Sequence, residues 1–406
     1  METILFSRCR VFDGHSPELL ETFDVLVEDG RIKEVSDRPI QTDSARVVPV
    51  KGRTLMPGLI DAHWHAVAAD VNLTRLDSMP ESLRISHARV YLEEALNRGF
   101  TTIRDAGGAD YGLAQAVEQG LIRGPRIFFC GRALSQTGGH GDMRPVQHLA
   151  ACCWSGAIGQ LADGPIEVRR AIREELRKGA HHIKIMVSGG AASPADPLWM
   201  LQYSEEEIRA AVDETARRRT YVMAHAHTSE AIRRSVEYGV RSVEHGTLID
   251  HDTAKVVAAR GAFVVPTLVV IAALWEQGAA FGLPRVSVDK IAELKDAARA
   301  SLEILKAAGV KVGFGTDLLG ILHREQSREF LLRAEVLSPL EVLRSATSVN
   351  ADLLGRAGEL GVVAPGAVAD LIVVDGNPLK DLGVLQEEGR YVSVIMKAGE
   401  FYKLAV

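Results

Sequence analysis

The chain has 406 residues, of which 47% are hydrophobic, and its formal net charge is −6. That length is enough for a large buried core in one big domain or two. An acidic chain without a basic stripe argues against nucleic acid as a partner. The four cysteines have no zinc-finger spacing and two of them are adjacent, so neither a disulfide framework nor a structural cysteine site is expected.

The first residues contain no long apolar core followed by a small-residue cleavage site, which a secretory signal would have. No uncharged apolar run approaches the ~18 residues that a membrane span needs. We therefore expect a cytoplasmic protein with no membrane partner.

Both ends of the chain are predicted to form short strands with tight turns. Isolated hairpins are only marginally stable, so we expect the two ends to pair. The predicted unit is one composite β-sandwich domain of residues 1–57 and 359–406. Its strands are expected within residues 4–12, 23–35, 45–50, 369–375 and 392–404.

Between the ends, strand patterns alternate with amphipathic helical stretches. Eight such strands over this length predict an α/β fold, a (β/α)8 TIM barrel of residues 58–358, with an open doubly wound sheet as the alternative. The eight predicted strands are 54–63, 99–105, 126–133, 181–188, 220–226, 241–245, 262–268 and 311–317.

A long segment, residues 134–164, follows the third predicted strand and has no clear period. Because it leaves the carboxyl end of a barrel strand, it lies on the face where barrel active sites form. It carries His140, Arg144, His148 and the run Cys152-Cys153-Trp154.

Polar side chains recur where five predicted strands end, and such ends converge in a barrel. These residue types suit metal binding or proton transfer. Core packing does not explain why such a residue stands at the end of each of the five strands. They are His63 and His65, Lys184, His225 and His227, His245, and Asp317. The first two are separated by one residue, so on a strand they point to the same side.

Lys184 stands between two isoleucines in a strand that should be buried. Burial disfavours its charged form and leaves a nucleophilic amine. That amine could form a Schiff base with a carbonyl substrate. It could instead add CO2 and become a carbamate, an anionic ligand that bridges two cations. The surrounding histidines favour the carbamate, and a lysine that reaches the barrel mouth is the structural alternative.

The chain resembles the amidohydrolase superfamily over essentially its whole length. The matching segments are Pro57-Gly-Leu-Ile-Asp-Ala-His63-Trp-His65, Lys184, Ala224-His225-Ala, Glu244-His245-Gly, Gly315-Thr-Asp317 and Pro365-Gly-Ala-Val-Ala-Asp-Leu-Ile-Val-Val-Asp375. Residues 100–108, 131–140 and 183–190 are similar to the binuclear-zinc dipeptidase branch. That branch includes prolidase-like and Xaa-Arg dipeptidase-like enzymes, and ochratoxin-hydrolysing amidohydrolases lie close to it.

The resemblance implies a metal centre with two divalent ions, zinc first, although cobalt or manganese could replace it. His63, His65 and Asp317 would hold one ion, His225 and His245 the other, and carboxylated Lys184 would bridge them with a hydroxide. Asp317 would act as general base and then acid. His140 would donate a hydrogen bond to the substrate carbonyl oxygen, or would only order its loop.

Four residues are candidates for substrate binding: His140, His227, Arg144 and His323. Prolidase-like relatives have tyrosine where this chain has His227, so the leaving-group preference is open. Arg144 would pair with a substrate carboxylate. By alternation Trp64 should point away from the metals and pack behind its strand.

The predicted activity is hydrolysis of a peptide-like amide, in an Xaa-Pro dipeptide first, another dipeptide or an N-acyl amino acid. Alternatives are a non-peptide amide such as ochratoxin A, a carbamate or an ester, because fold similarity does not choose among substrates. A lysine Schiff-base enzyme, a mononuclear deaminase and a non-catalytic scaffold are further alternatives. The expected partners are a small molecule with a carboxylate and further copies of the chain in a homo-oligomer.

Overall fold

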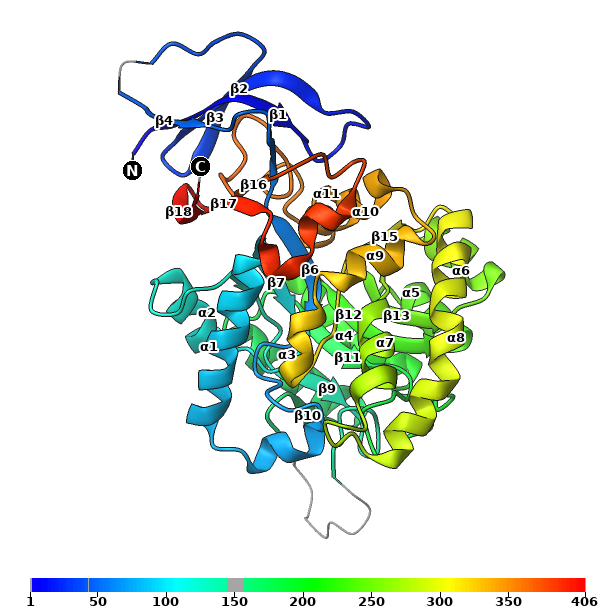
Figure 1. Ribbon diagram of the computed structural model, residues 1–406. Coiled ribbons are helices and arrows are strands. Elements are labelled where there is room, and N and C mark those ends of the chain that lie inside the picture. Colours follow the sequence, from blue (N-terminus) through cyan, green and yellow to red (C-terminus); the bar gives the residue numbers. More distant parts are fainter. Residues whose placement is uncertain (1, 43, 145–155, 406) are drawn as a thin grey trace.

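The computed structural model describes residues 2–42, 44–144 and 156–405. It contains a barrel of parallel strands with helices around it and a separate sheet made by the two ends of the chain (Figure 1). The predicted (β/α)8 barrel with a β domain from both chain ends is therefore confirmed, and the open doubly wound sheet is wrong.

The end sheet joins the first strands of the chain to the last. Its order is β18-β17-β16-β5-β1-β2-β3, with β4 paired to β1. Only Gly58 separates β5 from the first barrel strand, β6, so the end sheet continues directly into the barrel. The strands are β1 (Ile4–Val11), β2 (Leu20–Glu28), β3 (Arg31–Ser36), β4 (Arg46–Pro49), β5 (Thr54–Pro57), β16 (Leu371–Val374), β17 (Val392–Lys397) and β18 (Glu400–Leu404).

The barrel strands form two hydrogen-bonded groups, β6-β7-β8 and β10-β9-β11-β12-β13-β14-β15. Backbone bonds join the groups on both sides, from Ala62 N to Phe314 O (2.8 Å) and from His181 N to Phe129 O (2.8 Å). The strands are β6 (Leu59–Trp64), β7 (Phe100–Asp105), β8 (Arg126–Phe128), β9 (Ala133–Ser135), β10 (Gly159–Leu161), β11 (Ile183–Met186), β12 (Val222–Thr228), β13 (Ser242–Leu248), β14 (Phe263–Val265) and β15 (Lys311–Val312).

Helices follow the strands and cover the outside of the barrel (Figure 1). A capping box formed by Ser204 and Glu207 opens α4. The helices are α1 (Glu81–Asn97), α2 (Tyr111–Glu118), α3 (Gly164–Arg177), α4 (Glu205–Arg217), α5 (Ser229–Glu237), α6 (His251–Ala259), α7 (Leu268–Gln277), α8 (Arg285–Ala307), α9 (Arg328–Ala334), α10 (Pro339–Ser345) and α11 (Ser348–Leu353). Short 3-10 turns are Leu73–Ser78, Gly320–Glu325, Leu382–Leu385 and Glu387–Gly389.

The last predicted barrel strand is regular only at β15, because a side chain replaces its next ladder bonds. Asn350 Oδ1 accepts from Phe314 N (3.1 Å), and its Nδ2 donates to the carbonyl oxygens of Ile60 (2.7 Å) and Phe314 (2.8 Å). A Cβ on Gly315 would lie 2.7 Å from the Cβ of His63, so only glycine allows this close approach to β6. The segment thus ends with Asp317 beside the first strand.

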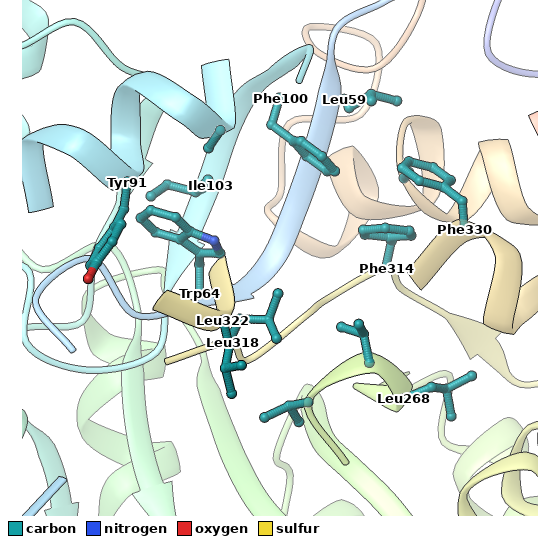
Figure 2. Packing of buried hydrophobic residues seen from close by; sticks show 14 of the residues in the cluster. Leu59, Trp64, Tyr91, Phe100, Ile103, Leu268, Phe314, Leu318, Leu322 and Phe330 are labelled. Atoms are coloured by element: carbon teal, nitrogen blue, oxygen red, sulfur yellow. The ribbon is translucent and has the colours of Figure 1, made fainter. Parts of the chain in front are cut away.

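Aromatic and aliphatic side chains fill the space behind β6 and β7 (Figure 2). Phe314 packs against Phe330 and Phe100, with ring centroids 4.5 Å and 5.8 Å apart. Trp64 is fully buried in this cluster, behind its strand as expected from alternation. This packing fixes the strand that carries His63 and His65. No helix in the described ranges is long and apolar enough to cross a bilayer.

Candidate metal centre

Eight of the polar residues predicted from the sequence line one cavity of about 80 Å³. They come from four barrel strands, from the residue directly after β6 and from the segments that follow β9 and β15, because the carboxyl ends of parallel strands in a barrel meet on one face. The eight are His63, His65, His140, Lys184, His225, His227, His245 and Asp317. The structure therefore brings the predicted metal-ligand set together.

Asp317 lies at the centre of one group of ligand atoms. Its Oδ1 is 3.1 Å from His65 Nε2 and 3.4 Å from His63 Nε2. Burial would raise the pKa of Asp317, but the neighbouring histidines outweigh burial and hold it well below its ordinary value. An ionised carboxylate between imidazoles is a donor set that suits a divalent ion such as zinc.

A buried ion pair orients His63. Its Nδ1 lies 2.7 Å from Glu244 Oε2, and Arg104 Nη2 donates to both oxygens of that carboxylate (2.9 and 3.0 Å). Burial favours the neutral form of Glu244, but Arg104 and His63 outweigh it and lower the pKa to about 2. The ionised Glu244 accepts the proton on Nδ1, which leaves the Nε2 lone pair of His63 directed at the cavity.

The outer ring nitrogens of His65 and His245 are fixed in a similar way. His65 Nδ1 lies 3.1 Å from the carbonyl oxygen of Gly107, and His245 Nδ1 lies 2.9 Å from Thr267 Oγ1. His245 and Asp317 also have positive φ angles, 72° and 55°. A left-handed backbone conformation costs about 1–3 kcal/mol of folding free energy at a residue other than glycine, and such residues are frequent at functional sites.

Residues His225 and His227 on β12 point into the same cavity, as their i, i+2 spacing predicts. The His225 ring lies 4.6 Å from the His245 ring, and the His227 ring lies 5.1 Å from it. Burial, reinforced by the neighbouring histidines, lowers the pKa of His225 well below its ordinary value and that of His227 to about 3. Both rings therefore have a lone pair available for an ion or a substrate.

Lys184 on β11 is only 2% exposed, and its amine forms no hydrogen bond or ion pair with any residue in the described ranges. Burial lowers its pKa, although Glu244 and Asp317 oppose that shift. An unpaired amine among histidines is the chemistry that addition of CO2 requires. With that group added, Lys184 would offer two oxygen ligands between the two histidine groups.

The donor types and the fixed outer nitrogens thus fit divalent ions. His63, His245 and Asp317 have ligand atoms within 4.8 Å of one another. His63, His65 and His245 each hold one ring nitrogen on a protein partner, as in metal sites with ordered outer contacts.

Two residues predicted to bind substrate do not line this cavity. Arg144 instead donates from Nε and Nη2 to the carboxylate of Asp142 (2.7 and 2.6 Å). His323 is fully buried against Trp64, with ring centroids 4.4 Å apart. The prediction that His323 contacts the substrate is corrected by this position, because its ring is packed against Trp64 and Tyr91 and is not part of the cavity lining. His148 and Cys152, Cys153 and Trp154 lie outside the described residues.

Arg104, Glu244 and Thr267 support the site from behind and were not among the predicted site residues. Arg104 and Glu244 were visible as polar residues in apolar strands, a pattern that indicates a buried ion pair. Thr267 gave no such signal. The cavity also has an apolar wall from α7 and α8, formed by Val270, Ile271, Leu274, Ile291 and Leu294.

Several known proteins are similar to this chain over most of its length. A solved prolidase structure complexed with N-methylphosphonate-L-proline is 51% identical, covers 99% of this chain and 100% of that chain, and has a TM-score of 0.97. A Xaa-Pro dipeptidase structure with bound methionine is 27% identical over 99% of this chain and 100% of that one, with a TM-score of 0.90. An ochratoxinase from Aspergillus niger is 34% identical over 379 residues, which are 89% of this chain and 77% of that protein.

Residues 54–400 match the profile of the amidohydrolase family, a range that includes every cavity residue described above. The match covers every barrel strand together with β5, β16 and β17 of the end sheet. The chain belongs to the amidohydrolase family.

Proposed function

We propose that this protein is a binuclear metal-dependent dipeptidase, with Xaa-Pro dipeptides as its first substrates. The observation that carries the proposal is the convergence of His63, His65, Lys184, His225, His245 and Asp317 on one buried cavity. The similarity to a prolidase whose structure was solved with N-methylphosphonate-L-proline supports the choice of substrate.

His63, His65 and Asp317 would hold one ion, and His225 and His245 would hold the second, with carboxylated Lys184 between them. Such a pair of ions, zinc first, supplies an activated water molecule and polarises the substrate carbonyl. The fixed outer nitrogens of the histidines keep the ligand rings oriented without cost at each turnover.

Asp317 would move the proton in this reaction. Its carboxylate is held ionised by the surrounding histidines, so an Oδ atom would accept a proton from water and return it to the amine nitrogen that leaves. His140 and His227 line the same cavity and are proposed to contact the substrate.

The apolar wall of α7 and α8 would bind the hydrophobic part of the substrate. Ile271 and Val270 are 5% exposed and face the cavity, and a pyrrolidine ring buries well against such side chains. Among the described residues, no arginine lines the cavity to pair with a substrate carboxylate. A free carboxylate on the substrate and a homo-oligomeric state stay predictions from the resemblance.

The test is a hydrolysis screen on metal-replete protein prepared with bicarbonate, with the metal content measured on the same sample. Substrates would include Xaa-Pro, Xaa-Arg, Xaa-Lys and Xaa-hydrophobic dipeptides and N-acyl amino acids. We expect two ions per chain and the highest kcat/KM on Xaa-Pro. Fewer than one ion per chain after reconstitution would rule out the proposal.

A second candidate is hydrolysis of a non-peptide amide such as ochratoxin A. It is favoured by the 34% identity to the ochratoxinase. Ochratoxin A would be included in the same screen, and two ions with turnover of ochratoxin A alone would select this candidate.

A further inference from the structure

A second cavity lies at the opposite end of the barrel from the candidate metal centre. It has a volume of about 560 Å³, and its lining includes Tyr221 and Arg241, which directly precede β12 and β13. The candidate ligands His225 and His245 stand farther along the same two strands, toward their carboxyl ends. Among the described residues, none lines both cavities. The second cavity is therefore separate from the site described above, and its volume is typical of a small-molecule site.

The lining of this second cavity is basic. It contains four arginines, and no aspartate or glutamate in the described ranges belongs to it. Because the whole chain has a formal net charge of −6, this concentration of positive charge is a local feature. A cavity with cations and no carboxylate in its wall attracts anions. The four arginines are Arg218, Arg219, Arg241 and Arg356.

Two of these arginines bind the carbonyl ends of helices beside the cavity. Arg241 donates from Nε to the carbonyl oxygen of Leu353 (3.1 Å) and from Nη2 to that of Asp352 (2.7 Å), at the end of α11. Arg218 Nη2 donates to the carbonyl oxygen of Leu176 at the end of α3 (3.4 Å). The carboxyl end of a helix carries negative partial charge and would repel an anion. These bonds compensate that charge.

Arg219 has no such structural role. It follows the C-cap of α4 with a φ angle of 54°, in the left-handed conformation that favours glycine. The same position after α3 and α11 is occupied by Gly179 and Gly355, which also line the cavity. The Arg219 guanidinium forms no hydrogen bond or ion pair with any residue in the described part of the chain. An unpaired cation thus stands where the backbone favours glycine.

Arg356 and His181 add further donors to the lining. Arg356 Cζ lies 5.9 Å from the centre of the Phe128 ring, and its Nη1 lies 3.3 Å from Glu359 Oε2. A guanidinium has five N–H donors, so most of those on Arg356 are unused within the described ranges. His181 Nδ1 accepts from Phe129 N (3.2 Å), so the proton of the neutral ring is on Nε2.

We propose that this second cavity binds a small molecule that carries a phosphate group. Guanidinium groups match phosphate oxygens with paired N–H donors, and Arg219 and Arg356 supply such donors. Phe128, Leu176 and Leu354 offer apolar surface to the rest of the ligand, so a phosphate ester fits the cavity better than inorganic phosphate. The site goes beyond the proposed function and does not depend on it.

The first test is isothermal titration calorimetry of the zinc-loaded protein at low ionic strength. The probes are AMP, inorganic phosphate and adenosine, which separate the phosphate group from the body of the ester. We expect AMP to bind, inorganic phosphate to bind more weakly, and adenosine not to bind. No binding of AMP at millimolar concentration, or adenosine binding as tightly as AMP, would overturn the proposal.

The second test assigns the binding to the arginines. Arg219→Gly removes the cation and places glycine where the backbone favours it, so the Tm should stay the same or rise and lost binding would not reflect unfolding. The Kd for AMP should increase roughly 10–100-fold in this variant and in Arg356→Ala, because hydrogen bonds to a charged group are lost. Arg217→Ala is the control, since Arg217 lies on α4, pairs with Asp213 (3.2 Å) and does not line the cavity.

A wild-type Kd in both Arg219→Gly and Arg356→Ala would place AMP elsewhere, for example on the metal ions, and would contradict the proposal. An equal increase of the Kd in Arg217→Ala would show general attraction by surface charge instead of a site, and would contradict it as well. Because binding is measured without turnover, failure of the proposed function leaves both readings intact.

Discussion

At the scale of single residues, the site depends on groups that are costly to bury. Lys184 and Asp317 line the cavity, Glu244 is buried behind it, and the pKa of each is shifted by burial or by neighbouring charges. Such groups are tolerated where partners or a metal compensate the lost hydration. Substitution of Lys184 or of Glu244 should therefore change how the site holds a metal ion.

Lys184→Met removes the amine that would be carboxylated and keeps a similar volume. We expect the metal content to fall below two ions per chain and the activity to fall by more than the 10–100-fold typical of losing an outer contact. Metal analysis and kcat/KM on the preferred dipeptide measure both effects. Lys184→Met with full metal content and wild-type activity would remove the bridging role.

Glu244→Gln takes away the carboxylate that orients His63 and leaves Arg104 without its buried anion. We expect a roughly 10–100-fold loss of affinity at the ion that His63 would bind. Competition with a chelator measures this affinity. Glu303→Gln, on the exposed face of α8, is the matched control and should leave the affinity unchanged. Equal chelator sensitivity in both variants would contradict the prediction.

At the scale of elements, α7 and α8 supply the apolar side of the cavity while the strands supply its polar side. Ile271→Ala enlarges the cavity on the α7 side. Lost contact with the substrate should lower kcat/KM for Xaa-Pro roughly 10–100-fold. The same change should raise the relative rate on bulkier amides such as ochratoxin A. Leu331→Ala, an exposed leucine on α9, serves as the control. An unchanged ratio between the two substrates would argue against substrate binding at this wall.

The strand ends were predictable because each polar residue follows a short apolar run, as His63 and His225 do. The shortening of the last strand was not, because Asn350 replaces ladder bonds from a distant helix. Lys290 donates to carbonyl oxygens of Gly190 and Asp196, which precede it by 100 and 94 positions. No local sequence pattern predicts such a distant contact. His323 resembled a substrate-binding residue in sequence, but its side chain packs on Trp64.

At the scale of the whole molecule, polar side chains join the end sheet to the barrel. Arg126 on β8 donates to Asp370, just before β16 (2.6 Å), and Lys397 on β17 donates to the carbonyl oxygen of Gly124 (2.7 Å). These contacts connect residues more than 200 positions apart. Removing the end sheet would therefore expose charged groups as well as apolar surface.

Lys397 gives this junction a pH dependence. Burial, together with Arg126, lowers its pKa to about 8, whereas a lysine in an unfolded chain has a pKa of about 10.4. Between these values the unfolded state binds more protons, so the contribution of Lys397 to the free energy of unfolding increases with pH, by at most about 1.4 kcal/mol per unit.

Urea unfolding of the wild type and Lys397→Met at pH 7, 8.5 and 10 measures this contribution. The wild type should gain stability relative to the variant as the pH rises. The same difference at all three pH values would show that Lys397 keeps its proton in the folded state.

The continuity of β5 and β6 through Gly58 also sets an order of events during synthesis. On the ribosome, the strand that carries His63 and His65 emerges early, but β5 pairs with β16, whose residues 371–374 emerge almost last. The pairing of β5 with β16, which holds β6 in place, is thus completed near the end of translation. Nascent chains stalled before residue 371 should bind no stoichiometric metal, so metal delivery is expected to follow release of the polypeptide.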